Sequence, residues 1–396
     1  MTMSTAFEVV LWLLAVLLTV PISVFVLECL LALLPGRHRR EDGARPDVCV
    51  LIPAHNEEAG LSATLATLLP TLQPDDRVLV IADNCTDATA SVARAQGVEV
   101  LERTDSEKRG KGFALEYGIR CLAARPAAVI VFLDADCQVT PQTVDQLARR
   151  VARTQRPVQG LNLSESESRG VQAVSSLGFH FKNHVRPAGL ARLGMPCHLM
   201  GTGMALPWQL ASEAVFGGAH LVEDMQLGVD LAIAGKATTF CPNALVTSRL
   251  PTGKRAFLSQ RTRWEHGHLR TSLTQIPRLL RGFLRTGNVR LLALALDLTI
   301  PPFTMLLFVW GAALGVCGLG AALGCGEGPL LVLASAGAAI AIAALGGWAK
   351  YCSHVVSLGA MASIPIYMLR KLPIYAAFVL QRGPRSWVRT EREAAR

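Results

Sequence analysis

Hydrophobic residues are concentrated at the two ends of this chain, whereas its middle alternates between short apolar runs and amphipathic stretches. Residues Phe7 to Leu34 are apolar except for Glu8 and Glu28, and a run of this length can cross a bilayer. Its basic end, residues 37–40, follows the apolar run instead of preceding it, which is the reverse of a cleaved signal peptide. The positive-inside rule therefore predicts an uncleaved anchor over residues 1–36, with the following residues in the cytoplasm.

The C-terminal part contains two further apolar runs of spanning length, Pro302–Leu323 and Leu330–Trp348. A third stretch, Val355–Leu380, is interrupted by prolines and by charged residues. It is typical of a further span, a re-entrant piece or an interfacial amphipathic helix, and the sequence leaves these three alternatives open. We therefore predict a membrane region over residues 291–382 with two or three spans, followed by a basic cytoplasmic tail over residues 383–396.

The middle of the chain, residues 45–290, has the pattern of an α/β domain. Helical stretches separate the short β-branched runs, and one of them, Thr86–Gln96, has Thr86 as its expected N-cap. Alternating strands and helices predict a mostly parallel sheet that binds ligands at the carboxyl ends of its strands. The expected strands are Val48–Ile52, Val78–Ala82, Val98–Leu101 and Val129–Leu133.

Polar residues directly follow three of these strands. They are Pro53–Glu58 after the first strand, Asp83–Asn84 after the second, and Asp134-Ala135-Asp136 after the fourth. A single aspartate at such a place is more often a solvated turn residue, but polar motifs after three of the four strands favour a ligand site. Two carboxylates one residue apart can share a divalent cation that also contacts phosphate oxygens.

Composition and charge exclude several other classes of protein. The formal net charge is +9, but the basic residues collect near the apolar segments and form no stripe interleaved with aromatic residues, so we expect no nucleic-acid partner. The ten cysteines are scattered singly, as small buried residues in a reducing compartment would be. No glycine-rich turn follows the first strand, which argues against a dinucleotide oxidoreductase. The sequence also has no P-loop, which argues against a nucleoside triphosphatase.

Further polar motifs occur later in the chain. They are Gly201-Thr202-Gly203, then Glu223-Asp224 at the start of a helical run, and finally the segment Gln260–Trp264. Taken alone, Asp224 is as often a helix cap as a functional carboxylate. The last segment, taken alone, also suits an ordinary helix face beside a membrane, where arginine and tryptophan are common.

Five motifs, taken in their order along the chain, resemble those of the family 2 glycosyltransferases. They are P-A-x-N-E, A-D-N, D-A-D, E-D and Q-x-x-R-W. The chain is more narrowly similar to the membrane-embedded branch of that family. That branch includes cellulose, hyaluronan and poly-N-acetylglucosamine synthases and ceramide glucosyltransferases. The resemblance implies a GT-A fold flanked by transmembrane helices and an inverting transfer. It also implies a nucleotide-sugar donor, usually a uridine diphosphate sugar, with Mg or Mn as cofactor.

The resemblance also implies where the donor binds. The P-A-x-N-E residues would line the nucleoside pocket, and the aspartate of A-D-N would contact the base edge. The lysine of R-G-K-G-F would neutralise phosphate charge, and the glutamine and arginine of Q-x-x-R-W would hold the diphosphate. Asp134 and Asp136 would face the donor, with Asp136 the better candidate for the metal. The expected donor-binding residues are Pro53, Ala54, Asn56, Glu57, Asp83, Lys111, Asp134, Gln260 and Arg263.

On the acceptor side, the resemblance makes Asp224 the expected general base. Trp264 would stack on the acceptor sugar, and Gly201, Thr202 and Glu223 would contribute to the acceptor site. Asp224 is far from the expected metal pair in sequence, as suits a base that acts on the face opposite the leaving group.

Three readings of the function remain. The first is transfer to a polyprenyl-linked or growing glycan during exopolysaccharide, capsule or lipopolysaccharide assembly, at the bacterial inner membrane and alongside polysaccharide-assembly partner proteins. The second is a ceramide-type glycolipid glycosyltransferase. The third is an inactive membrane scaffold that retains the fold. The few expected spans favour simple transfer over threading of a polymer, and the sugar and the linkage are left open.

Overall fold

A computed structural model describes residues 3–36, 41–165, 171–216, 223–249 and 254–380 of the chain. The chain divides into two compact units. The helical unit comprises Met1–Pro35, Ser166–Gly194 and His268–Gly383, and the sheet unit comprises Gly36–Glu165, Met195–Gly267 and Pro384–Arg396. The basic segment 37–40 and the predicted tail 383–396 lie outside the described residues.

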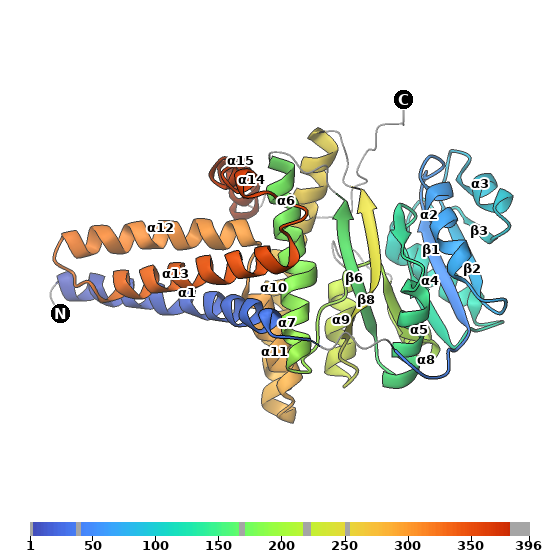
Figure 1. The fold of residues 1–396 in the computed structure, drawn as a ribbon, viewed down its shortest axis with the longest axis horizontal. Coiled ribbons are helices and arrows are strands. Elements are labelled where there is room, and N and C mark those ends of the chain that lie inside the picture. The colour runs from blue at the N-terminus through green and yellow to red at the C-terminus, as the bar shows by residue number, and fades with distance from the viewer. Residues whose placement is uncertain (1–2, 37–40, 166–170, 217–222, 250–253, 381–396) are drawn as a thin grey trace. The chain divides into compact units, whose positions relative to one another are not determined.

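The described part of the sheet unit contains one eight-stranded sheet with the strand order β3-β2-β1-β4-β7-β6-β8-β5 (Figure 1). The pairs β1–β2, β1–β4, β2–β3 and β6–β8 are parallel, and β4–β7, β6–β7 and β5–β8 are antiparallel, so the predicted mostly parallel sheet is confirmed. The strands are β1 (Val48–Ala54), β2 (Arg77–Asp83), β3 (Glu99–Arg103), β4 (Val129–Phe132), β5 (Cys137–Val139), β6 (Val158–Glu165), β7 (Met204–Pro207) and β8 (Thr239–Arg249).

The central strands are apolar along their whole length because helices cover both faces of the sheet. On β1, Val48, Val50 and Ile52 pack into the same core as α2 (Leu61–Leu68) and α5 (Thr143–Thr154). Cys49 and Leu51 point to the opposite core, which contains α4 (Lys111–Leu122), α8 (Trp208–Glu213) and α9 (Glu223–Ile233). This two-sided burial holds the carboxyl ends of the parallel strands β1, β2 and β4 at one edge of the sheet, where the site residues predicted after these strands lie.

One predicted helix start is wrong. Helix α3 runs from Thr89 to Ala95, so it begins three residues after the expected N-cap, Thr86. The side chain of Asp87 accepts a hydrogen bond from the backbone N–H of Thr89 at 3.0 Å. Thr86 instead hydrogen-bonds to the loop that follows β1, so a tertiary contact outweighed its local capping preference.

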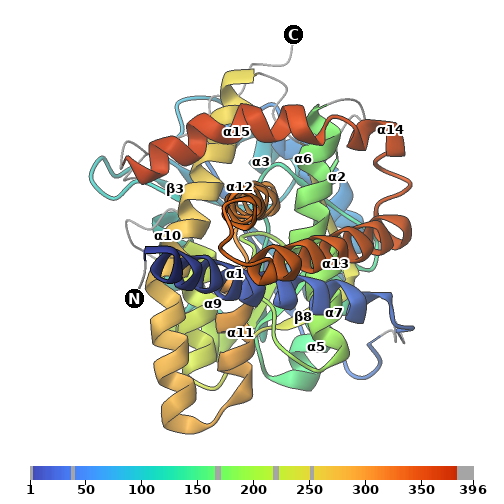
Figure 2. The same cartoon turned by 90° about the vertical axis from the view of Figure 1, so that its left-hand side faces the viewer.

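Three described helices of the helical unit are long and apolar enough to cross a membrane: α1 (Met3–Leu33), α12 (Phe303–Ala322) and α13 (Gly328–Tyr351). They correspond to the three clear apolar runs of the sequence. The remaining predicted stretch forms the short helix α14 (Leu358–Met361) and α15 (Ile364–Val379). Figures 1 and 2 together show α15 running across the direction of α12, which favours the interfacial alternative for this stretch.

The helical unit also takes in residues 166–194 and 268–290, which belong to the range 45–290 predicted as one domain. They form α6 (Val171–His180), a π-helical turn (Phe181–Val185), α7 (Arg186–Arg192), the second part of α10 (Lys254–Thr286), and the start of α11 (Val289–Thr299). A Cβ atom added at Gly189 of α7 would lie 1.9 Å from the carbonyl oxygen of Glu28, so only glycine permits this contact with α1. The four segments predicted from the sequence, residues 1–36, 45–290, 291–382 and 383–396, stay a prediction.

A buried charged cluster also joins these segments. The Nε atom of Arg186 donates to Glu28 Oε2 at 2.8 Å, and its Nη2 atom donates to the backbone oxygen of Asp297 at 2.9 Å and to the Asp297 carboxylate. All three side chains belong to buried residues. A charge buried without a partner is costly. Arg186 supplies the partner for Glu28, an acidic residue within the N-terminal apolar run.

Candidate active site

The loops after β1 and β2 are linked by reciprocal hydrogen bonds. Asn56 has a left-handed backbone (φ 53°), and its Nδ2 atom donates to Thr86 Oγ1 at 3.1 Å while its Oδ1 atom accepts from the Thr86 N–H at 2.7 Å. The N–H of Glu57 donates to Thr89 Oγ1 at 2.8 Å. Pro53 and Ala54 end β1 beside Ile81 and Ala82 of β2. The predicted nucleoside-pocket residues therefore lie in a cross-linked pair of strand ends, and their contact with a nucleoside stays a prediction.

Asp83, the expected base-contacting residue, ends β2 and is 5% exposed. Its Oδ1 atom accepts hydrogen bonds from Arg103 Nη1 at 2.5 Å and from Asn84 Nδ2 at 3.0 Å. Sequence reasoning missed Arg103, although this residue ends the next strand, β3, and lies directly opposite Asp83 in the parallel register. The ion pair holds the Asp83 carboxylate in one orientation.

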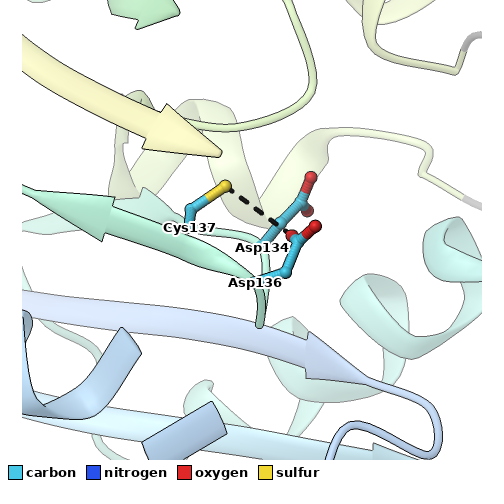
Figure 3. A group of neighbouring side chains, drawn as sticks. All are labelled: Asp134, Asp136 and Cys137. Atoms are coloured by element: carbon cyan, nitrogen blue, oxygen red, sulfur yellow. Dashed lines mark hydrogen bonds between the residues drawn. The ribbon is translucent and has the colours of Figure 1, made fainter. Parts of the chain in front are cut away.

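Asp134, Asp136 and Cys137 place one ligand atom each within 4.8 Å of one another (Figure 3). The Cys137 Sγ atom donates weakly to Asp136 Oδ1 at 3.7 Å. Burial, together with the charges of Asp136 and Asp134, raises the pKa of the Cys137 thiol well above its usual range, so it stays protonated. The donor set is therefore two carboxylates, and hard divalent cations such as Mg²⁺ and Mn²⁺ prefer such oxygen ligands.

Lys111, the first residue of α4, connects this acidic pair to a second loop. Its Nζ atom hydrogen-bonds to the Asp134 carboxylate and to the backbone oxygen of Gly201 at 2.7 Å. Burial alone would lower the pKa of Lys111, but the carboxylates of Asp134, Glu223 and Asp224 raise it above its usual value. A permanent positive charge therefore lies between the acidic pair and the Gly201 loop.

Gly201 has a left-handed backbone (φ 83°) and brings a further carboxylate close to this group. A Cβ atom added there would lie 3.2 Å from Asp224 Oδ2 and 3.6 Å from Lys111 Nζ. The next residue, Thr202, is buried, and its Oγ1 atom accepts a hydrogen bond from the N–H of Asp134 at 3.0 Å. The structure thus brings together Lys111, Asp134, Gly201 and Asp224, and Thr202 holds the acidic loop through its hydrogen bond with the Asp134 N–H.

Gly201→Ala is expected to lower stability by about 1–2 kcal/mol, because a side chain strains a left-handed backbone. It should lower any activity further, because the added methyl group would contact Asp224 and Lys111. Gly97→Ala is the matched control, since Gly97 is also left-handed (φ 75°) but an added Cβ has no atom within 4 Å. Equal loss of activity in both variants, with thermal unfolding compared in parallel, would contradict the role given to the space at Gly201.

Glu223 and Asp224 begin α9 side by side. Burial, followed by the charge of Asp224, raises the pKa of Glu223 from 4.5 to about 7, although Lys111 opposes this shift. The two carboxylates therefore hold one proton between them over much of the range below neutral pH.

A raised carboxyl pKa predicts that stability decreases as the pH rises. The folded state retains the Glu223 proton up to about pH 7, whereas the unfolded chain releases it near pH 4.5. The stabilisation is thus fully present below pH 4.5 and is lost as the pH passes 7. Thermal unfolding of the donor-free protein should show a smaller decrease across this window in Glu223→Gln. Identical pH dependence in the variant and the parent protein would contradict the raised pKa.

The Q-x-x-R-W residues lie on the first part of α10. Gln260, Arg263 and Trp264 are half-buried and share one side of the helix by their spacing. The Oε1 atom of Gln260 is buried, with no hydrogen-bond partner in the described part of the chain. Sequence reasoning missed Arg261, whose guanidinium carbon lies 5.3 Å from the centre of the Trp264 ring. The contacts of these residues with a diphosphate or a sugar stay predictions.

Comparison with known proteins now identifies the family. The model of a family described as "Glycosyltransferase like family 2" matches residues 46–267, which is more than half of the chain. This chain belongs to that family. The match confirms the family expected from the five motifs, and the matched range contains all five of them.

Two curated relatives share this part of the chain. The probable glycosyltransferase YdaM of Bacillus subtilis is 25% identical over 284 residues, which cover 67% of this chain and 64% of YdaM. The probable glucomannan 4-beta-mannosyltransferase 9 of Oryza sativa subsp. japonica is 27% identical over 250 residues, which cover 57% of this chain and 46% of that protein. The chain thus spans less than two thirds of the length of either relative.

A solved structure also resembles this chain. It is the mannosyltransferase PcManGT from Pyrobaculum calidifontis in complex with GDP-Man and Mn²⁺, with a TM-score of 0.58 and 20% sequence identity. The match covers 93% of this chain and 98% of that protein. At this level of identity the likeness concerns the fold, and it confirms the GT-A-like α/β arrangement that the sequence predicted.

Proposed function

We propose that this chain is an inverting membrane glycosyltransferase that transfers a sugar from a nucleotide diphosphate sugar, with a UDP-sugar as the expected donor. The acceptor would be a polyprenyl-linked or growing glycan in exopolysaccharide, capsule or lipopolysaccharide assembly. One observation carries the proposal. The acidic pair Asp134 and Asp136 is suited to a cation, and Lys111 and the Gly201 loop connect this pair to a separate carboxylate, that of Asp224. A sugar transfer needs these two kinds of group on opposite sides of the reacting carbon.

On the donor side, the diphosphate gains negative charge as the sugar–phosphate bond breaks. Asp136 and Asp134 would hold Mg²⁺ or Mn²⁺, and their close spacing and all-oxygen donor set fit such a cation. When bound, the cation supplies positive charge to the leaving diphosphate. Asp134 already faces Lys111, which makes Asp136 the stronger candidate ligand. The Mn²⁺ named in the PcManGT complex supports the choice of a divalent cation.

The chain's own cations and hydrogen-bond donors would complete this side. Lys111 places an ammonium beside the acidic pair, and Gln260 and Arg263 would hold the diphosphate oxygens. Pro53, Ala54, Asn56 and Glu57 would surround the nucleoside, and Asp83, oriented by Arg103, would contact the base edge.

On the acceptor side, Asp224 would take the proton from the attacking hydroxyl group. Asp224 Oδ2 lies close to the Gly201 backbone, where an added Cβ atom would be 3.2 Å from it, so glycine at this position keeps the loop from crowding the carboxylate. Glu223 would tune the charge of Asp224, and Trp264 would offer an apolar face to the acceptor sugar. Thr202 holds the acidic loop in place through the Asp134 N–H, which supports a positioning role more than direct acceptor contact.

The membrane setting is part of the proposal. Three described helices could cross a bilayer, and the basic residues that follow the first of them in the sequence favour a cytoplasmic sheet unit. The expected location is the bacterial inner membrane, with a multi-pass chain and polysaccharide-assembly proteins as partners. Three spans offer few helices to enclose a polymer, which favours single transfer to a lipid-linked acceptor.

Two other functions compete with this proposal. A ceramide-type glycolipid glycosyltransferase would use the same donor chemistry with a different acceptor. An inactive scaffold would need no intact site, whereas this chain retains the acidic motifs and the Lys111 contacts. The scaffold is therefore the weaker alternative.

The test is incorporation from a panel of radiolabelled UDP-sugars and GDP-sugars into membranes that contain the chain, with Mg²⁺ or Mn²⁺. Membranes with the Asp224→Asn variant provide the matched control. Label from one donor in a lipid-soluble product, absent from the control, would support the proposal, and the chemistry of that lipid would separate a polyprenyl acceptor from a ceramide. Label in long polymer would show a processive synthase. No incorporation from any donor would favour the scaffold.

A further inference from the structure

The second part of α10 carries an exposed stripe of leucines that the proposed chemistry does not use. Leu273 is 70% exposed, Leu280 37% and Leu284 81%. At about 100° per residue, these three side chains lie within about 40° of one another around the helix axis. We call them the leucine stripe. Single exposed leucines are common, but three aligned along one side of a helix are a less ordinary surface feature.

The leucine stripe faces away from the body of the helical unit. The opposite side of α10 is buried through Thr271, Gln275 and Leu279. A Cβ atom added at Gly282, on that same side, would lie 2.9 Å from Leu291 of α11. Helix α10 therefore packs on its own unit with one face and presents leucines on the other.

Arginines border the leucine stripe along one flank. Arg278, Arg281 and Arg285 are exposed, and the helical period places them between about 80° and 140° around the axis from Leu273. The sequence contains no Asp or Glu between Glu265 and Asp297, so no acidic residue of this segment offsets their charge. An apolar stripe beside an all-basic flank complements a surface that is apolar inside and negatively charged outside.

The direction of α10 suits such a surface. Figures 1 and 2 show its second part running across the direction of α1, α12 and α13, which belong to the same helical unit. If those three helices cross a bilayer, α10 lies along the membrane plane. A helix in that plane can place leucines among the acyl chains and arginines among the headgroups.

We propose that the leucine stripe and Arg278, Arg281 and Arg285 form a docking surface for an anionic lipid headgroup layer. This inference rests on the proposed membrane setting but not on the identity of the sugar or on activity. A nucleic acid is a poorer partner, since it would leave the leucines without an apolar contact. A folded protein would have to match both the stripe and its flank, whereas any anionic bilayer provides both chemistries.

The test is amide hydrogen exchange of the full chain in nanodiscs of phosphatidylcholine alone or of phosphatidylcholine mixed with phosphatidylglycerol. The amides of residues 278–286 should exchange about tenfold more slowly in the anionic discs, and those of α5 should not change. Arg281→Gln with Arg285→Gln should remove this difference, whereas Arg281→Lys with Arg285→Lys should retain it. Leu280→Asn with Leu284→Asn should speed exchange in both lipids.

The charge-matched control is Arg120→Gln with Arg125→Gln, which removes two exposed arginines from the sheet unit. This control should keep the full lipid difference. Equal exchange in the two lipids would overturn the proposal, as would loss of the difference in the control variant. Because the readout needs no sugar transfer, these outcomes are independent of the donor panel.

Discussion

Asp224→Asn is expected to lower the rate of sugar transfer by about 10²- to 10⁴-fold while donor affinity stays nearly unchanged. The substitution keeps the shape of the side chain but removes the group that accepts the acceptor's proton. Donor affinity should persist because Lys111 contacts the other acidic site, Asp134, on the donor side. The measurement is the single-turnover transfer rate together with donor binding by calorimetry.

Asp230→Asn is the control for this prediction. Asp230 lies on the same helix, α9, is exposed, and accepts hydrogen bonds from Gln226 at 3.1 Å. Removing its charge changes the helix by the same chemistry without touching the Gly201 loop. Full transfer activity in Asp224→Asn would end its assignment as the general base, and a comparable loss in Asp230→Asn would indicate a general effect on α9.

Asp136→Ala is expected to weaken metal-dependent donor binding by at least about tenfold, because a divalent cation loses one of two carboxylate ligands. The fold should tolerate the change, since Asp134 retains its contacts with Lys111 and Thr202. The measurement is donor affinity as a function of Mn²⁺ concentration, with no transfer required.

The matched control for Asp136→Ala is Asp75→Ala, which removes an exposed carboxylate in the turn before β2. Its Mn²⁺ dependence should equal that of the parent chain. Unchanged Mn²⁺ dependence in Asp136→Ala would move the metal site away from the D-A-D motif. This chain would then share its fold with PcManGT but not a metal site at the D-A-D motif.

The strands of the first half of the sheet could be predicted because their burial follows from local sequence. The runs at Val48 and Val129 are apolar at every position, and a strand covered on both faces requires this pattern. The start of α3 could not be predicted in the same way. Thr86 has the chemistry of an N-cap, but Asn56, 30 residues earlier, hydrogen-bonds to it, and the N-cap position of α3 falls on Ala88 instead.

In the candidate site, too, residue types could be recognised from the sequence, whereas contacts between distant residues could not. Asp134 and Asp136 were recognised because paired carboxylates at a strand end suit a divalent cation, and Asp224 was recognised only through the resemblance of the motifs to the family. Their mutual distances were not available from spacing, since 90 residues separate Lys111 from Gly201. Arg103 was missed because it becomes a partner of Asp83 only through the parallel register of β2 and β3.

By itself, the sequence determined the α/β domain, the three apolar helices and the motifs that place the chain in its family. These features depend on hydrophobic period, run length and residue type, all of which are local. Only the tertiary structure decided that Lys111 bridges Asp134 and Gly201, and that Arg186 joins Glu28 to Asp297 across 158 and 111 residues. Electrostatic and steric contacts depend on distance in space, and chain folding sets that distance through packing that no short segment encodes.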